Sequence, residues 1–196
     1  MTLFHSRLLL ACALLPAFAV MAAPAVPGMD EDAQAHAHSP RQGGCETFTW
    51  DVSRELAAMD GPAVDIVSAR SAPGSARIEP GVRHDVALHP QSGVRLLAEP
   101  PRKPPEGATA GHVVFQVPAP GRYRVAITTR HWIDVFDAGT ALATIGHEGR
   151  PGCPAMRKVV ELDLPAGRDL VLQVDSGQGD TVGVLVNRAE VEQAKP

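Results

Sequence analysis

The sequence predicts a mainly β protein, an antiparallel β-sandwich or jelly-roll-like fold with one short N-terminal helix. The first observation is the strict alternation of apolar and polar residues in short runs between Gly111 and Val186, as at Val113, Phe115 and Val117. Such alternation is typical of strands that bury one face. The second is that Gly, Pro and Asp turns separate these runs at intervals of about ten residues, as in sandwiches and jelly rolls. The third is that no helical period follows Gly111.

The first 25 residues are expected to be a signal peptide. Arg7 supplies a positive charge before the apolar run Leu8–Met21, and small residues suited to cleavage follow it. Cleavage is expected after Ala22 or Ala25. The apolar run is shorter than the span of about 20 residues that a transmembrane helix needs. We therefore expect no stable membrane span, and a mature protein that is periplasmic or secreted.

Residues 26–44 are expected to form a flexible linker, because they hold almost no bulky apolar side chain and end in Gly-Gly. His36 and His38 lie in this stretch, close to the acidic run Asp30–Asp32. Such a tail can bind a divalent metal weakly through imidazole and carboxylate groups. A periplasmic metal-handling protein that works through these two histidines is therefore one alternative function.

The folded domain is expected over residues 45–191, followed by a tail at 192–196. Once the signal peptide is removed, Cys45 and Cys153 remain, and two cysteines in an oxidising compartment predict one disulfide. Two unpaired thiols are the competing interpretation. Cys12, within the signal segment, resembles a lipidated bacterial cysteine, but the apolar run continues beyond it.

A short amphipathic helix is predicted over Phe48–Asp60, where Val52, Leu56 and Met59 recur at helical spacing before Gly61-Pro62. A strand from Thr47 is the competing prediction. Four weaker strand candidates follow: Ala63–Val67, Ala76–Ile78, Arg83–Leu88 and Gly93–Ala98. Residues 100–107 are rich in proline, which a central strand excludes, and predict a long exposed connection.

The stronger strand candidates come later in the chain. They are residues 112–117, 122–129, 131–137, 159–164, 169–175 and 181–186. Between them, Gly146–Pro154 is expected to be a loop that carries Cys153. The charge adds little about partners: 18 basic and 22 acidic residues give a net charge of −4, which argues against a nucleic-acid partner.

Two sets of residues are candidates for function. An iron or zinc enzyme needs two histidines and a carboxylate on one face, and His131 with His147 and Glu148 is the constellation to test; the last two converge only if they lie in a loop. Trp50 and Trp132 are candidates for a sugar-stacking platform, with burial in the core as the competing interpretation. No catalytic residue is assigned, and no cofactor is expected apart from a possible divalent metal.

The segments VVFQVPAPGRYRVAITT and DLPAGRDLVLQVDSG resemble bacterial pre-peptidase C-terminal-type β-sandwiches. The resemblance covers Gly111–Val186 and implies a non-catalytic exported module. The segments CETFTWDVSRELAAM, HWIDVFD and GCPAMRKVVELDLPAG are similar to small exported proteobacterial proteins of unknown role. Some of these carry the label homogentisate 1,2-dioxygenase, and that label implies an Fe(II) enzyme with two histidines and a glutamate.

The function expected from the sequence is that of an exported, non-catalytic β-sandwich that binds a partner in the bacterial cell envelope. The partner is expected to be an envelope protein or a glycan. The alternatives are a metal-dependent oxygenase or hydrolase, or the metal-handling protein described above.

Overall fold

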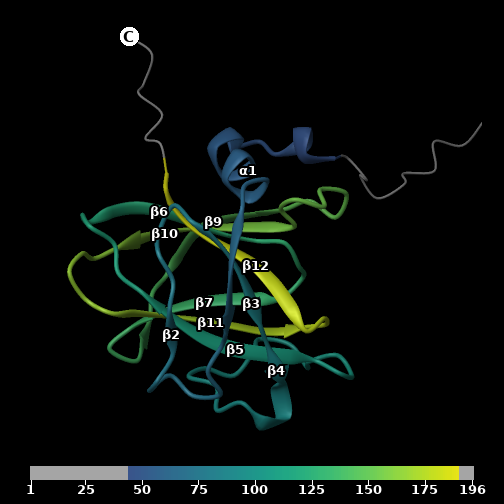
Figure 1. The fold of residues 1–196 in the computed structure, drawn as a ribbon, viewed down its shortest axis with the longest axis vertical. Helices are drawn as coiled ribbons and strands as arrows, with labels where there is room; N and C mark the ends of the chain where they lie inside the picture. The colour runs from purple at the N-terminus through teal and green to yellow at the C-terminus, as the bar shows by residue number, and fades with distance from the viewer. Residues whose placement is uncertain (1–43, 190–196) are drawn as a thin grey trace, which may run out of the picture. The chain divides into compact units, whose positions relative to one another are not determined.

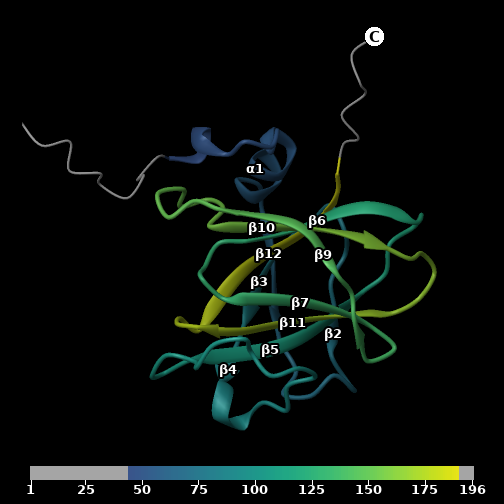
Figure 2. The same cartoon turned by 180° about the vertical axis from the view of Figure 1, so that it is seen from behind.

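The computed structural model describes residues 44–189, which fold as a β-sandwich of two mixed sheets (Figures 1 and 2). The first sheet has the order β1-β3-β12-β6-β10-β9. Its strands are β1 Ala63–Val67, β3 Arg83–Ala87, β12 Thr181–Arg188, β6 Gly121–Ile127, β10 Lys158–Leu164 and β9 Thr144–Gly149. The second sheet has the order β2-β5-β11-β7-β8, and β4 pairs with β5 beside this path. Its strands are β2 Ala76–Arg77, β5 Thr109–Phe115, β11 Leu170–Gly177, β7 Trp132–Asp137, β8 Thr140–Ala141 and β4 His89–Pro90.

The prediction of a sandwich is confirmed, but the sheets are not wholly antiparallel. β1 pairs with β3 in parallel, and β2 pairs with β5 in parallel. Parallel neighbours need a connection that crosses over. The chain supplies one here because it leaves β1, forms β2 in the opposite sheet and then returns to β3.

The main core lies between the two sheets and comes from the alternating residues that the sequence singled out. Phe115 of β5, Val125 of β6 and Leu172 of β11 are fully buried in it. Because each strand gives every second side chain to this core, the intervening residues form two outer faces. Those faces differ in chemistry, and the difference places the candidate site.

The outer face of the first sheet is sealed by an apolar N-terminal segment. The α-helix α1 (Ser53–Met59) lies over this sheet, after the 3-10 turn η1 (Cys45–Thr47) (Figure 1). A second apolar cluster joins the two layers, with Val52 and Met59 packed against the side chains of Ala126, Val159 and Leu185. Burial of this apolar area holds the segment on the sheet.

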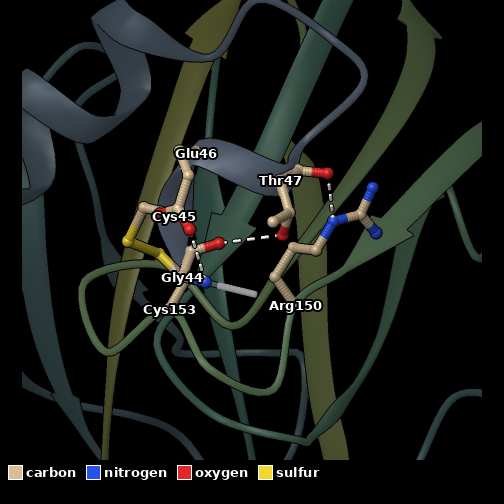
Figure 3. Close-up of a disulfide and its surroundings, with 6 residues drawn as sticks. All are labelled: Gly44, Cys45, Glu46, Thr47, Arg150 and Cys153. Carbon is tan, nitrogen blue, oxygen red and sulfur yellow. Dashed lines mark hydrogen bonds between the residues drawn. A yellow bond between two sulfur atoms is a disulfide. The ribbon is translucent and has the colours of Figure 1, made fainter. Parts of the chain in front are cut away.

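The predicted disulfide is confirmed, because Cys45 and Cys153 are bonded in the structure (Figure 3). Beside it, Arg150 Nε donates a hydrogen bond of 2.7 Å to the carbonyl oxygen of Thr47. The Thr47 hydroxyl donates in turn to the carbonyl oxygen of Gly44. The start of the domain is thereby tied to the chain after β9.

The helix is shorter than predicted, since it begins at Ser53 rather than at Phe48. The amide groups of Thr49 and Trp50 both donate to the Glu148 carboxylate of β9, which holds this stretch outside a helix. Asp51 then accepts a hydrogen bond from the Ser53 amide at the helix start. A long-range contact therefore overrides the local helical pattern.

The outer face of the second sheet is covered by residues 91–108, here called the strap (teal, beside β4 in Figure 1). The strap opens with the 3-10 turn η2 (Gln91–Gly93) and holds no strand. The predicted strand Gly93–Ala98 is therefore wrong, whereas the irregular Pro-rich connection over residues 100–107 is confirmed. The strap is tied down by a side chain instead: Gln173 of β11 binds the amide of Leu97 and the carbonyl oxygen of Ala98.

The predicted signal peptide, most of the linker at 26–44, and the tail at 192–196 lie outside the described residues. Between residues 44 and 189, no helix has the length and apolar character that crossing a membrane requires.

Candidate functional site

The outer face of the second sheet presents a cluster of polar side chains beneath the strap. His112 of β5, Gln173 and Asp175 of β11, and Asp134 of β7 all alternate with core residues and so point away from the main core. His112, Gln173 and Asp175 are fully buried. Gln173 is their centre, since its amide nitrogen donates to Asp175 Oδ2 at 2.8 Å and its oxygen lies 3.2 Å from His112 Nε2. The strap thus covers a polar layer.

Three atoms of this layer have no hydrogen-bonding partner. Within the described part of the chain, the buried side-chain nitrogen and oxygen atoms without a partner are His112 Nδ1, Asp175 Oδ1 and Ser176 Oγ. Each such group costs about 1–3 kcal/mol when it is desolvated. Ser176 also has a positive φ of 55°, which is uncommon for a residue other than glycine. Unpaired polar atoms and backbone strain commonly coincide at functional sites.

A cleft of about 660 Å³ opens between the strap and the end of the sandwich next to this layer. The strap contributes the apolar rings of Pro100, Pro101 and Pro105 and the cations Arg102 and Lys103. The opposite wall is formed by Thr129, Arg130, Trp132, Lys158, Ser176, Gly177 and Gln178. The cleft therefore joins residues that are distant in sequence and come from both sheets.

Trp132 at the start of β7 is the aromatic surface of the cleft. Its side chain is 41% exposed, although the sequence holds only two tryptophans and one tyrosine. The ammonium group of Lys158 lies 5.2 Å from the ring centroid, a cation–π distance, and donates a 2.6 Å hydrogen bond to the carbonyl oxygen of His131. The Trp132 side chain also hydrogen-bonds to Asp134. The indole is therefore held in place while one face stays open.

The rim of the cleft carries several cations. Arg102, Lys103, Arg130 and Lys158 line it, and Arg157 lies close enough to Arg130 for repulsion to contribute to lowering its pKa. Among residues 44–189, none of these five groups forms a salt bridge with a carboxylate. The cleft is therefore locally positive in a chain whose net charge is −4.

Burial and the charges around the cleft shift the pKa values of Lys158 and Asp134. Burial lowers the pKa of Lys158, and Arg157 and Arg130 lower it further, while Asp175 and Asp134 oppose the change. Burial also raises the pKa of Asp134, and its hydrogen bond with Trp132 opposes the change. The two acids thus balance part of the positive charge from beneath the cleft, whereas the outer cations stay uncompensated.

His131 supports the wall of the cleft and is fully buried. Thr109 donates its hydroxyl proton to the carbonyl oxygen of Gly179, so it accepts from His131 Nε2 at 2.9 Å. Thr129 then donates to His131 Nδ1 at 2.6 Å. Burial, followed by the nearby charge of Lys158, lowers the pKa of His131 to about 4. The imidazole is therefore neutral near pH 7, and both of its nitrogens form hydrogen bonds.

The structure does not bring together His131, His147 and Glu148, the predicted metal ligands. The segment expected to be a loop, Gly146–Pro154, begins within β9, so His147 and Glu148 lie on opposite faces of an edge strand, and His147 is exposed. Within the described range 44–189, no group of three His, Cys, Asp or Glu side chains is arranged to hold a metal ion. His36 and His38 lie outside that range.

Glu148 has a structural role instead. Its carboxylate accepts hydrogen bonds from the amides of Thr49 and Trp50 and from the Thr49 hydroxyl, and it pairs with Arg150 at 2.6 Å. Burial raises the pKa of Glu148, but these hydrogen bonds and the charge of Arg150 outweigh it, so the pKa lies below its ordinary value. Glu148 fixes the N-terminal segment to β9.

Trp50 and Trp132, the two predicted platform residues, lie on different sheets. Trp50 packs with the second apolar cluster on the first sheet, and the guanidinium of Arg124 lies 5.1 Å from its ring centroid. It also faces Gly146, where a Cβ atom would approach its ring to 3.0 Å. Trp50 is thus a packing residue, and Trp132 alone lines the cleft.

The sequence reasoning missed the basic residues of the site. Adjacent cations at 102–103 and 157–158, together with Arg130, were visible as a signal in a chain of acidic net charge. They lie on three separate segments, however, and only the strap and the sandwich edge bring them to one cleft.

No protein-family model matches the chain, and no curated protein matches it. Among solved structures, the chain is similar to a β-glucosidase from Kluyveromyces marxianus in complex with glucose, with 14% sequence identity and a TM-score of 0.32. The match covers 43% of this chain and 11% of that chain. At this level the likeness carries no conclusion about function.

Proposed function

We propose that this protein is an exported, non-catalytic binding module of the cell envelope, and that its cleft binds an acidic saccharide. The observation that carries the proposal is the half-exposed indole of Trp132 among cations that form no salt bridge with a carboxylate within residues 44–189. The sequence led to the same class of function, with a glycan or an envelope protein as the partner.

The two kinds of group match the two parts of an acidic sugar. The apolar face of a pyranose ring packs on an aromatic ring, which explains the open face of Trp132. A carboxylate on the sugar would pair with Arg130 or Lys158, and charge-assisted hydrogen bonds of this kind are the strong ones. The prolines of the strap add a stiff apolar wall.

Binding suits the site better than catalysis does. A glycoside hydrolase needs two carboxyl groups facing the scissile bond. Asp175 is fully buried, and Asp134 is engaged by the Trp132 side chain. Both acids serve to hold the wall of the cleft, and the groups that face outward are donors and cations.

The resemblance to pre-peptidase C-terminal-type sandwiches stays a prediction and is compatible with a binding module. The confirmed disulfide supports an oxidising compartment outside the cytoplasm. The dioxygenase alternative loses its candidate ligand set, because His131 is engaged by two threonines and Glu148 by the N-terminal segment.

Isothermal titration calorimetry with a galacturonate oligosaccharide tests the proposal. Two variants should weaken binding at least about tenfold, a change of about 1.4 kcal/mol: Trp132→Ala, and the double variant Arg102→Ala with Lys103→Ala. The affinity of the wild-type protein should also fall as salt rises, since the contacts are ionic.

Two controls separate the cleft from the rest of the surface. Ile145→Ala removes an exposed apolar residue on the first sheet, and Arg168→Ala removes an exposed cation elsewhere. Both should bind like the wild-type protein, and a neutral galactose oligosaccharide should not bind. Binding that survives Trp132→Ala unchanged, or no binding of the acidic sugar at all, would overturn the proposal.

A further inference from the structure

The cleft is one of three hollows that follow the strap. A second hollow, of about 580 Å³, is lined mainly by strap residues such as Leu96, Glu99 and Pro104. A third, of about 480 Å³, lies between the strap and the segment that precedes β2, where Arg70 and Arg95 meet. All three are open at the surface, and all three are lined in part by the same strap.

The hollows adjoin one another, because neighbours share lining residues. Pro105 lines both the cleft and the second hollow. Ser92, Val94 and Arg95 line both the second and the third hollow. We call this row of three adjoining hollows, from Trp132 along the strap to Arg70, the trough.

The far end of the trough is cationic like the near end. The amide of Arg95 donates a 2.7 Å hydrogen bond to the carbonyl oxygen of Arg70, which places the two residues side by side. Gly93 leaves space for the Arg70 guanidinium, since a Cβ atom at residue 93 would lie 2.8 Å from its Nη1. Among the described residues, neither guanidinium forms a salt bridge. The hydroxyl-bearing residues Ser71 and Ser92 line the same hollow.

Both arginines line the third hollow, so an anion bound there would be attracted by two cations. The middle of the trough is different, because Pro90, Pro104 and Leu96 give it an apolar surface and Glu99 is its acidic residue. Anionic groups therefore fit the two ends, and less polar surface fits the centre.

We propose that the trough binds a linear acidic polysaccharide, with one uronate at the Trp132 cleft and another at Arg70 and Arg95. This inference rests on the proposed function and extends it from a single acidic sugar to a polymer. Two linked sites give a polymer an affinity that neither site gives to a short ligand, because the second contact is intramolecular.

The chemistry of the trough favours a polysaccharide over single-stranded nucleic acid, the other linear polyanion. Nucleic-acid bases need several aromatic platforms, whereas Trp132 is the only aromatic residue in the described linings of the three hollows. The carboxylates of a polyuronate are separated by apolar sugar faces, and so are the two cationic ends of the trough.

A length series of galacturonate oligosaccharides, from the dimer to the dodecamer, tests the inference with the full mature protein. The wild-type affinity should rise steeply once the oligomer is long enough to reach both ends. The double variant Arg70→Ala with Arg95→Ala should remove this rise, with a loss of about tenfold for the longest oligomer and no change for the dimer. Arg168→Ala is the matched control and should keep the full length dependence.

The outcomes separate the two proposals. If the dimer binds through Trp132 but the affinity does not rise with oligosaccharide length, the proposed function of the cleft is supported and the polymer inference fails. If no oligomer binds, both fail. A single-stranded oligonucleotide of matched charge should bind at least about tenfold more weakly than the dodecamer, and tighter binding of the oligonucleotide would overturn the polysaccharide assignment.

Thermal unfolding of each variant should match that of the wild-type protein, because the substituted side chains are exposed.

Discussion

His131 supports the cleft through hydrogen bonds, and one of them, from Thr129, forms only while its ring is neutral. Thr129 donates to Nδ1, and protonation of Nδ1 would remove the lone pair that accepts this bond. The carbonyl oxygen of His131 receives Lys158, whose ammonium group lies over Trp132. Its ring lies against Gly177, where a Cβ atom would come within 2.4 Å of it. A buried residue thus sets the position of two binding groups.

The low pKa of His131 predicts a loss of stability in mild acid. The unfolded chain takes up this proton near pH 6.5 and the folded protein only near pH 4, so the contribution is fully present above pH 6.5 and is lost as pH falls to 4. The shift corresponds to about 3 kcal/mol. Urea unfolding at pH 7 and at pH 4.5 should show this loss.

His131→Gln supplies the comparison, because glutamine keeps polar contacts but does not titrate. The variant should be less stable at pH 7 and lose less stability than the wild-type protein between pH 7 and pH 4.5. His112, whose pKa is also lowered by burial, is present in both proteins, so its effect cancels in the difference. Equal losses in the two proteins would contradict the assignment.

At the scale of elements, the N-terminal segment and the strap are two covers of opposite character. The segment that contains α1 adds apolar side chains to the first sheet, and its start is bonded to Cys153. The strap adds irregular backbone to a polar layer that contains the three unpartnered buried atoms. The first cover adds apolar burial to its sheet, whereas the second, on our proposal, contacts a ligand.

Removing the disulfide tests the first cover. The bond joins residues 108 positions apart, and a loop of this size is worth about 5 kcal/mol in chain entropy. The double variant Cys45→Ala with Cys153→Ala should lose stability on this scale in denaturant unfolding and should expose the apolar cluster to a hydrophobic dye. Its affinity for the acidic sugar at low denaturant should not change, because the cleft lies on the other sheet.

A stability loss below about 1 kcal/mol would show that Glu148 and the apolar contacts alone fix the segment. The variant Glu148→Gln distinguishes these contributions, because it keeps the shape of the side chain but removes the charge that pairs with Arg150.

At the scale of the whole molecule, the two sheets, the N-terminal segment and the strap should differ in how easily they unfold locally. Local opening needs least free energy where few apolar contacts are broken, and this describes the strap rather than the N-terminal segment. Brief trypsin treatment of the native protein should therefore cut first after Arg95 and Arg102, both exposed on the strap. A bound acidic oligosaccharide should slow these cuts.

Arg54, an exposed residue of α1, provides the internal reference for this experiment. Cleavage after Arg54 before any cleavage of the strap would show that the N-terminal segment opens first. Protection of Arg54 by the sugar to the same extent as the strap would indicate global stabilisation rather than contact at the trough.

The sequence by itself determined the sandwich, because the two-residue period of strands such as β6 and β11 is a local property that burial on one face requires. It also determined the disulfide, since only two cysteines remain after Cys12. The candidate residue Trp132 came from its type alone. Each of these predictions depends only on a pattern of a few neighbouring residues, on the number of cysteines or on the type of one residue.

The tertiary structure decided the rest. Residues 48–52 have a helical pattern but are held outside a helix by Glu148, which lies about a hundred positions later. Gly93–Ala98 looks like a strand but is bound by a side chain of β11. The basic cleft comes from three segments, and charge acts through space rather than along the chain. Local pattern therefore determined core strands such as β6 and β11, whereas only the folded arrangement determined the edge strand β9 and which loops line the candidate site.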